Sequence, residues 1–319
     1  MFYLNHFRKS SFTIAFIVAA CSILMANYKG DKSLNHPSVN GSFNAVKDSS
    51  KHIYLFDQPD EVFVLGTQLS EISGLAYHTE LDQLYAVNDE QGRYFVIDKN
   101  NGELLARQKF HKKADYEGIE LIDNEVIIVK NTGTVLFYNT QKDNLRQFKT
   151  KLNATNDVEG LCYDKADRIL LLACKGQNTD GLRDKTIKSV YGFSLDSMKL
   201  IDQPVLDIYD DELIEYLASE LDHMNKIQKI KFQNRAKSFS PSGIAIHPLN
   251  QHLYILSAKG SILLILDEKY NIHHIEYLNA KTIPQPEGIC FDSDANLYIS
   301  TEGQGFSGKI FKYNFQNGN

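Results

Sequence analysis

The chain has 319 residues, with 34 Lys and Arg against 40 Asp and Glu and a formal net charge of −6. Lys and Arg are scattered singly, and because no basic stripe is present to displace the counterions of phosphates, nucleic-acid binding is not expected. Apolar residues make up 43% and charged residues 23%, which is typical of a globular protein long enough for one large all-β domain or two ordinary domains.

The first residues have the layout of an export signal. Arg8 and Lys9 precede a mostly apolar run over residues 10–20, which is shorter than the about 20 residues that a membrane-spanning helix needs. The motif VAAC, ending at Cys21, resembles the lipobox of bacterial lipoproteins. That resemblance implies cleavage before Cys21 and its acylation, with Ser22 favouring the outer membrane. An ordinary signal peptide or an uncleaved anchor is the alternative.

The next stretch is polar and shows no apolar period. Residues 21–55 are rich in Asn, Ser, Lys, Gly and Asp, so they bury too little apolar surface to offset the entropy lost on folding. We therefore expect a signal peptide over residues 1–20, a flexible tether over 21–55 and a folded domain over 56–319. The folded domain is expected outside the cytoplasm, in the cell envelope, held by the lipid.

Five segments of similar sequence recur along the rest of the chain. Each has a glycine, an apolar strand, a polar turn and a second apolar strand. A period in the low forties with three or four short strands is typical of a β-propeller blade. The aligned glycines lie at intervals of 44, 42, 83 and 45 residues and are Gly74, Gly118, Gly160, Gly243 and Gly288.

The repeats predict the strands that follow each glycine. A strand over residues 61–69 is expected to pair into the last blade, closing the ring and removing an exposed edge. The expected second strands are 84–89, 126–131, 169–175, 253–259 and 297–303. The expected third strands are 92–98, 133–138, 188–195, 260–267 and 308–315.

The interval of 83 residues leaves the number of blades open. Within it, Leu213, Leu217, Leu221 and Met224 recur at helical spacing behind an acidic start, which predicts a helix near 208–232 inserted into a blade. Residues 176–186 form a second insertion between two strands. Without these insertions the interval holds about one blade, so five blades are favoured and six are the alternative.

The repeat sequences resemble a known family. EISGLAY, DYEGIE, DVEGLCYD, LYAVNDEQGRYFVID and PEGICFDSDANLYISTE are similar to the SdiA-regulated family of bacterial envelope proteins, which is related to NHL-repeat and phytase-like propellers. The resemblance covers about residues 60–319. It implies a propeller exported to the envelope, with calcium or ligand binding as a plausible property, and it implies no defined activity.

Acidic residues accompany the repeat glycines, and a propeller brings equivalent positions of successive blades into one ring. Such a ring of carboxylates suits Ca²⁺, which takes about six to eight oxygen ligands in loose geometry. The alternative is that each glutamate accepts backbone N–H bonds from the neighbouring blade and so joins the blades. The candidate metal or ligand residues are Glu117, Glu159 and Glu287, before the glycines, with Asp89, Glu90 and Glu302, which end second strands.

Cysteines and histidines provide no further site. Cys162, Cys174 and Cys290 lie in apolar strand patterns and are expected to be buried free thiols, with a Cys162–Cys174 bridge as the alternative. The histidines show no paired ligand spacing, so a solvated surface is expected for His111, His247, His252, His273 and His274.

Two classes of function remain. The first is an envelope lipoprotein whose propeller is a binding platform for a ligand or an envelope partner, with Ca²⁺ at the axial mouth as an expected cofactor. The second is a metal-dependent hydrolase of the lactonase, esterase or phytase kind, in which the acidic ring holds a metal-activated water. The absence of a basic cluster in the sequence disfavours phytase.

Overall fold

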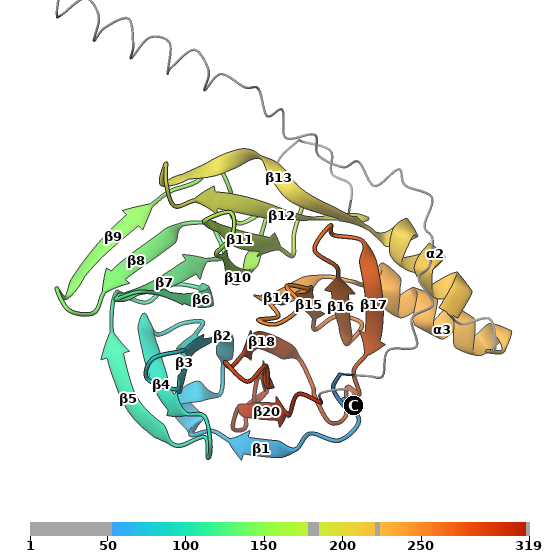
Figure 1. The fold of residues 1–319 in the computed structure, drawn as a ribbon, viewed down its shortest axis with the longest axis horizontal. Coiled ribbons are helices and arrows are strands. Elements are labelled where there is room, and N and C mark those ends of the chain that lie inside the picture. The colour runs from blue at the N-terminus through green and yellow to red at the C-terminus, as the bar shows by residue number, and fades with distance from the viewer. Residues whose placement is uncertain (1–52, 178–184, 221–223, 317–319) are drawn as a thin grey trace, which may run out of the picture. The chain divides into compact units, whose positions relative to one another are not determined.

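The computed structural model describes residues 53–177, 185–220 and 224–316, which form five four-stranded antiparallel sheets around one axis (Figure 1). The expected signal peptide, Cys21 and all but the last residues of the expected tether lie outside the described residues. Tyr54 is buried in the core, so the packed part begins before residue 56. The five-bladed propeller is confirmed.

The first three strands of each blade run outward from the axis in chain order. The innermost strands are β2 (Ile72–His78), β6 (Tyr116–Ile122), β10 (Val158–Asp164), β14 (Pro241–Ile246) and β18 (Pro286–Phe291). The second strands are β3 (Gln83–Asn88), β7 (Glu125–Lys130), β11 (Ile169–Cys174), β15 (Leu253–Ser257) and β19 (Leu297–Thr301). The third strands are β4 (Arg93–Asp98), β8 (Val135–Asn139), β12 (Ile187–Ser194), β16 (Ile262–Leu266) and β20 (Lys309–Tyr313). These agree closely with the expected strands.

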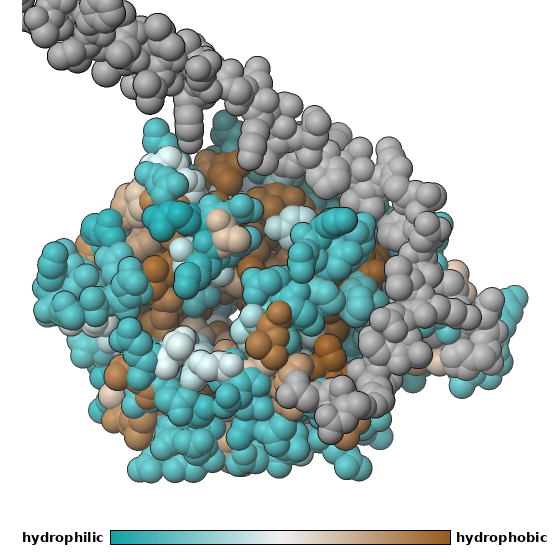
Figure 2. All heavy atoms as spheres, viewed as in Figure 1, coloured by the Kyte–Doolittle hydropathy of each residue, from teal (hydrophilic) through white to brown (hydrophobic). Residues whose placement is uncertain are grey.

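The outermost strands differ from the others in burial. They are β5 (Leu104–Lys109), β9 (Asn144–Phe148), β13 (Lys199–Tyr209), β17 (Ile272–Tyr277) and β1 (Glu61–Val64). Second and third strands are buried on both faces and read as continuous apolar runs, whereas β5 is exposed along almost its whole length. In the view along the axis in Figure 2, hydrophilic residues accordingly cover most of the visible face.

The ring is closed by the strand nearest the N-terminus of the domain. β1 pairs antiparallel with β20, with Glu61 opposite Lys312 and Val64 opposite Lys309. This confirms the expected closure, although β1 is shorter than the predicted strand, because a short 3-10 helix (Thr67–Leu69) follows it. The last blade therefore contains strands from both ends of the domain, and β1 covers the edge of β20 that would otherwise be exposed.

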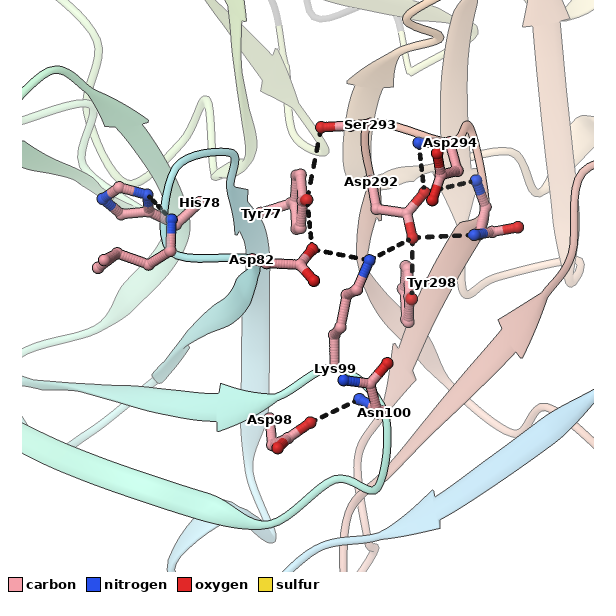
Figure 3. A network of polar contacts seen from close by, with 12 residues as sticks. Tyr77, His78, Asp82, Asp98, Lys99, Asn100, Asp292, Ser293, Asp294 and Tyr298 are labelled. Carbon is pink, nitrogen blue, oxygen red and sulfur yellow. Dashed lines mark hydrogen bonds and ion pairs between the residues drawn. The ribbon is translucent and has the colours of Figure 1, made fainter.

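A polar network joins the first blade to the last (Figure 3). Lys99 Nζ, from the first blade, lies 2.7 Å from Asp82 Oδ1 and 3.3 Å from Asp292 Oδ2 of the last blade. The Asp292 side chain is only 1% exposed and also accepts a hydrogen bond from the hydroxyl of Tyr298. Because one ammonium group satisfies carboxylates on both sides, the network ties the blades together without leaving a buried charge unpaired.

The repeat glycines are where the innermost strands of neighbouring blades touch. β2 packs on β6, β6 on β10, β10 on β14, β14 on β18, and β18 on β2. None of the five glycines has a positive φ, so the requirement is for space, and in each blade the pairing register shifts beside the glycine. A Cβ would lie 2.8 Å from Ile119 N at Gly74, 2.5 Å from Leu161 Cβ at Gly118, 2.9 Å from Ile244 Cγ2 at Gly160, 2.4 Å from Glu287 O at Gly243 and 2.8 Å from Leu75 Cβ at Gly288.

The helical insertion lies between two blades rather than within one, and it contains two helices. α2 (Asp210–Glu220) and α3 (Lys226–Lys237) connect β13 to β14. Leu213 and Leu217 are buried, as their helical spacing predicted. Asn225 is the N-cap of α3 and forms a capping box with Gln228. This Asn-x-x-Gln pattern indicates a second helix start, which the prediction of a single helix missed. In the described ranges no helix is long and apolar enough to cross a bilayer.

Gly243→Ala is expected to destabilise the protein by about 1–3 kcal/mol, because its Cβ would meet a backbone carbonyl that cannot move without its blade. Gly66→Ala is the control, since that glycine has φ −66° and its Cβ would meet nothing closer than 3.8 Å. Urea unfolding of both variants measures the difference. Equal stability of the two variants would contradict the proposed need for space between blades.

Candidate functional site

We call the end of the axis at which the innermost strands begin the upper mouth, and the opposite end the lower mouth. The residue before each repeat glycine lies at the upper mouth. Glu117, Glu159 and Glu287 line the axial channel there, together with the glycines and a ring of aliphatic residues. The free space beside them is about 10 Å³, which holds no more than about one water. A ligand must therefore lie over this mouth, with at most one small group reaching inward.

The other predicted acidic residues follow second strands at the same end. Asp89 follows β3 and Glu302 follows β19. Asp89 is close enough to Glu117, and Glu302 to Glu287, to raise the pKa of that channel carboxyl. Burial and then Glu90 raise the pKa of Asp89 to about 6, and one Asp89 carboxylate oxygen is buried without a hydrogen-bond partner. Glu90 itself is exposed, so it belongs to the outer rim.

Lys175 is a residue of the upper mouth that the sequence analysis missed. Its Nζ lies 2.9 Å from Glu159 Oε1. Burial by itself would lower the pKa of Lys175. The carboxylates of Glu159 and Glu287 outweigh that effect and raise it. Lys175 follows β11 as Asp89 follows β3 and Glu302 follows β19, so the repeat alignment could have revealed it.

The channel carboxyls are short of compensating charge. Burial, followed by repulsion from Glu159, raises the pKa of both Glu117 and Glu287 to about 9. Burial also raises the pKa of Glu159, against the opposing effect of Lys175. Among the residues that the structure describes, no hydrogen bond or ion pair reaches the carboxyl of Glu117 or Glu287. Burial and the neighbouring carboxylates therefore favour the protonated form of both acids when no ligand is bound.

Two of the five joints between blades carry a hydrogen bond from a serine, and none of the described joints carries one to a glutamate carboxyl. Ser73 Oγ donates to the carbonyl of Tyr116 at 2.8 Å, and Ser242 Oγ donates to that of Pro286 at 2.6 Å. These serines occupy the position that Glu117, Glu159 and Glu287 occupy in other blades, yet Glu159 bonds only to Lys175 of its own blade. The expectation that glutamates accept joining N–H bonds is wrong for the described residues.

A ready calcium site is not present at this mouth. Across residues 53–177, 185–220 and 224–316, no three His, Cys, Asp or Glu side chains are grouped so as to hold a metal ion. Calcium needs about six to eight oxygens, whereas here an ammonium group already lies against Glu159. The residues as placed do not fit the ion, and calcium stays a prediction.

The cysteine expectation is confirmed and the histidine expectation is partly wrong. Cys162, Cys174 and Cys290 are buried free thiols; a Cys162–Cys174 bridge does not form, because the two residues lie near opposite ends of the β10–β11 pair. His247 is fully buried, not solvated, and its Nε2 lies 3.0 Å from the Tyr54 hydroxyl. Burial lowers the pKa of His247 to about 4, so it is a neutral packing residue of the core.

Comparisons with known proteins agree with this fold. No curated protein matches the chain in sequence. The glutaminyl cyclase of Myxococcus xanthus is similar with TM-score 0.51 and 11% identity, over 82% of this chain and 97% of that one. The PQQ-bound aldose sugar dehydrogenase of Streptomyces coelicolor is similar with TM-score 0.44 and 11% identity, over 81% and 100%. At such identities the likeness concerns the fold alone. The family model described as SdiA-regulated matches residues 61–307, and the chain belongs to that family.

Proposed function

We propose that the protein is a lipid-anchored envelope protein whose propeller binds a ligand or partner at the upper mouth through a positively charged group. The anchor is Cys21, in the lipobox-like motif VAAC. The binding surface is the acidic mouth formed by Glu117, Glu159 and Glu287, with Asp89 and Glu302 beside them. The ligand or partner binds on the face of the propeller, because the channel is too narrow to enclose it.

The observation that carries this proposal is the pair of half-buried acids, Glu117 and Glu287, whose carboxyls form no hydrogen bond or ion pair within the described residues. Keeping Glu117 and Glu287 next to Glu159 destabilises the free protein, since each ionised form is desolvated and repelled. An ammonium or guanidinium group over the mouth would let both acids ionise and would supply the hydrogen bonds that they lack. Perturbed carboxyls in a concave, rigid site are typical of functional sites.

The hydrolase alternative has less support. It needs a metal with its ligands in place and a base beside a metal-bound water. The described carboxyls supply no such grouping, and Lys175 occupies the place next to Glu159 where a cation would lie. We therefore favour the binding function and keep hydrolysis as an outcome of the test.

N-acetyl-lysine methylamide is expected to raise the thermal unfolding midpoint saturably, because it presents one ammonium group from a capped backbone. N-acetyl-norleucine methylamide, which lacks the charge, is the matched control ligand. The effect should be lost in the Glu117→Gln/Glu287→Gln variant and retained in Glu90→Gln, whose side chain is exposed at the rim. Differential scanning calorimetry measures the unfolding midpoint, and isothermal titration calorimetry measures the binding.

Equal effects of the charged and neutral ligands, or no effect of either, would contradict binding of a cation at the upper mouth. A saturable response to Ca²⁺ that is lost in the same double variant would instead support the calcium prediction. Turnover of a lactone, an ester or a phosphoester in the presence of Ca²⁺ would then favour the hydrolase.

The stability of the protein is expected to fall as pH rises from about 7 to 9. Unfolded glutamates are already ionised above pH 7, whereas Glu117 and Glu287, with folded pKa values of about 9, still hold protons. Each group therefore lowers the free energy of unfolding progressively over this range, by about 1–2 kcal/mol after solvent screening is allowed for, and the loss is complete once pH passes about 9. Urea unfolding should show a flatter pH dependence in Glu117→Gln/Glu287→Gln, and an unchanged slope in that variant would refute the assignment.

Cys21→Ser is expected to abolish lipid attachment. The variant should incorporate no labelled palmitate and should leave the membrane fraction, because one uncleaved apolar segment of this length anchors poorly. Ser22→Ala is the control and should still be labelled. Membrane retention of Cys21→Ser without label would indicate an uncleaved anchor instead of a lipoprotein.

A further inference from the structure

A second cavity lies on the axis at the lower mouth, away from the site described above. Its volume is about 110 Å³, and the innermost strands of all five blades contribute to its wall. The residues that line it are mostly apolar, including Leu161, Ile244 and Phe291, whereas most of the surface that they expose to the cavity is polar. For comparison, an apolar cavity of about 150 Å³ binds benzene, so the lower cavity has room for a ligand of a few heavy atoms.

The repeat alignment explains why this space is open. Two residues after the repeat glycine, the innermost strands carry Ala76, Cys162, Ala245 and Cys290, all small and buried. In the remaining blade the same position carries Glu120. One long acidic side chain therefore shares a ring with four short apolar ones, and the volume that the short side chains leave unfilled is the cavity.

Glu120 brings a negative charge into this apolar surrounding. Oε1 accepts the N–H of Leu121 at 2.8 Å, and Oε2 accepts the N–H of Tyr163 at 2.9 Å. These bonds fix the carboxylate, yet within the described part of the chain no Lys, Arg or His forms an ion pair with it. Burial raises its pKa to about 7, against the effect of the two hydrogen bonds. Each oxygen keeps a lone pair for a further donor.

We propose that the lower cavity binds a small organic ammonium ion, with Glu120 as its counter-charge. The ammonium group donates to the free lone pairs of the carboxylate, while its short alkyl part contacts the apolar side chains of the lining. A metal ion fits poorly, because Glu120 is the one carboxylate in the lining and calcium needs about six to eight oxygens.

This inference is independent of the function proposed for the upper mouth. A ring of five aliphatic residues, one after each repeat glycine, separates the two ends of the axis. The ring consists of Leu75, Ile119, Leu161, Ile244 and Ile289. Ligands at the two mouths therefore do not share a carboxylate, and variants at one mouth serve as controls for the other.

The test uses ethylammonium chloride, with ethanol, sodium acetate and sodium chloride as neutral, anionic and salt controls. Ethylammonium is expected to bind saturably in isothermal titration and to raise the unfolding midpoint, whereas the controls are not. Glu120→Gln, which keeps the side-chain shape, should weaken binding at least about tenfold. Ala76→Leu should also abolish it by filling the cavity while the charge remains. Glu117→Gln, at the upper mouth, tests whether the amine binds there instead, and Glu103→Gln, which removes an exposed carboxylate in the turn before β5, should bind as the unchanged protein does.

No saturable binding of ethylammonium, equal binding of ethanol, or full binding by Glu120→Gln would each overturn the proposal. Loss of binding in Glu117→Gln with retention in Glu120→Gln would also overturn it and would place the amine at the upper mouth. If Ala76→Leu does not fold, the outcome is still decided by comparing the binding of ethylammonium and of the control compounds to Glu120→Gln and to the unchanged protein.

Discussion

The close approach of the five innermost strands at the repeat glycines is the contact on which the rest of the structure depends. At Gly243 even a methyl group would meet the carbonyl of Glu287 at 2.4 Å. The spacing between these blades is therefore set by direct contact of one backbone with the other. Because every blade makes the same contact, residues at one offset from each glycine lie at one height on the axis. A linear repeat in the sequence is thereby converted into stacked rings of side chains.

The order of these rings gives the axis its two ends. The residue before each glycine is a serine or a glutamate and forms the polar upper mouth. The residue after it is Leu or Ile in every blade, and this aliphatic ring lines the channel. Carboxyls above and below the aliphatic ring are therefore desolvated by the same apolar layer while lying in separate sites. That layer is one physical reason why Glu117, Glu287 and Glu120 all have raised pKa values.

Sequence alone predicted the features that repeat and are apolar. Second and third strands such as β11 and β16 are buried runs, and the closure by β1 follows from a last blade that lacks a strand. Outer strands were not located individually, because a sequence such as LLARQK in β5 is exposed and alternates too weakly to indicate a strand. Burial of His247 depends on Tyr54, which is distant in sequence, and so no local pattern indicated it.

The chemistry lies in departures from the repeat, which is why architecture was easier to predict than function. Lys175 stands where other blades have Asp89 and Glu302, and it supplies the positive charge in an acidic mouth. Glu120 stands where other blades have alanine or cysteine, and it supplies the negative charge in an apolar cavity. A position that only joins blades can be the same in all of them, as the glycine is. A position that differs in one blade alone breaks the ring's symmetry, and a small ligand there meets a single charged group on one side.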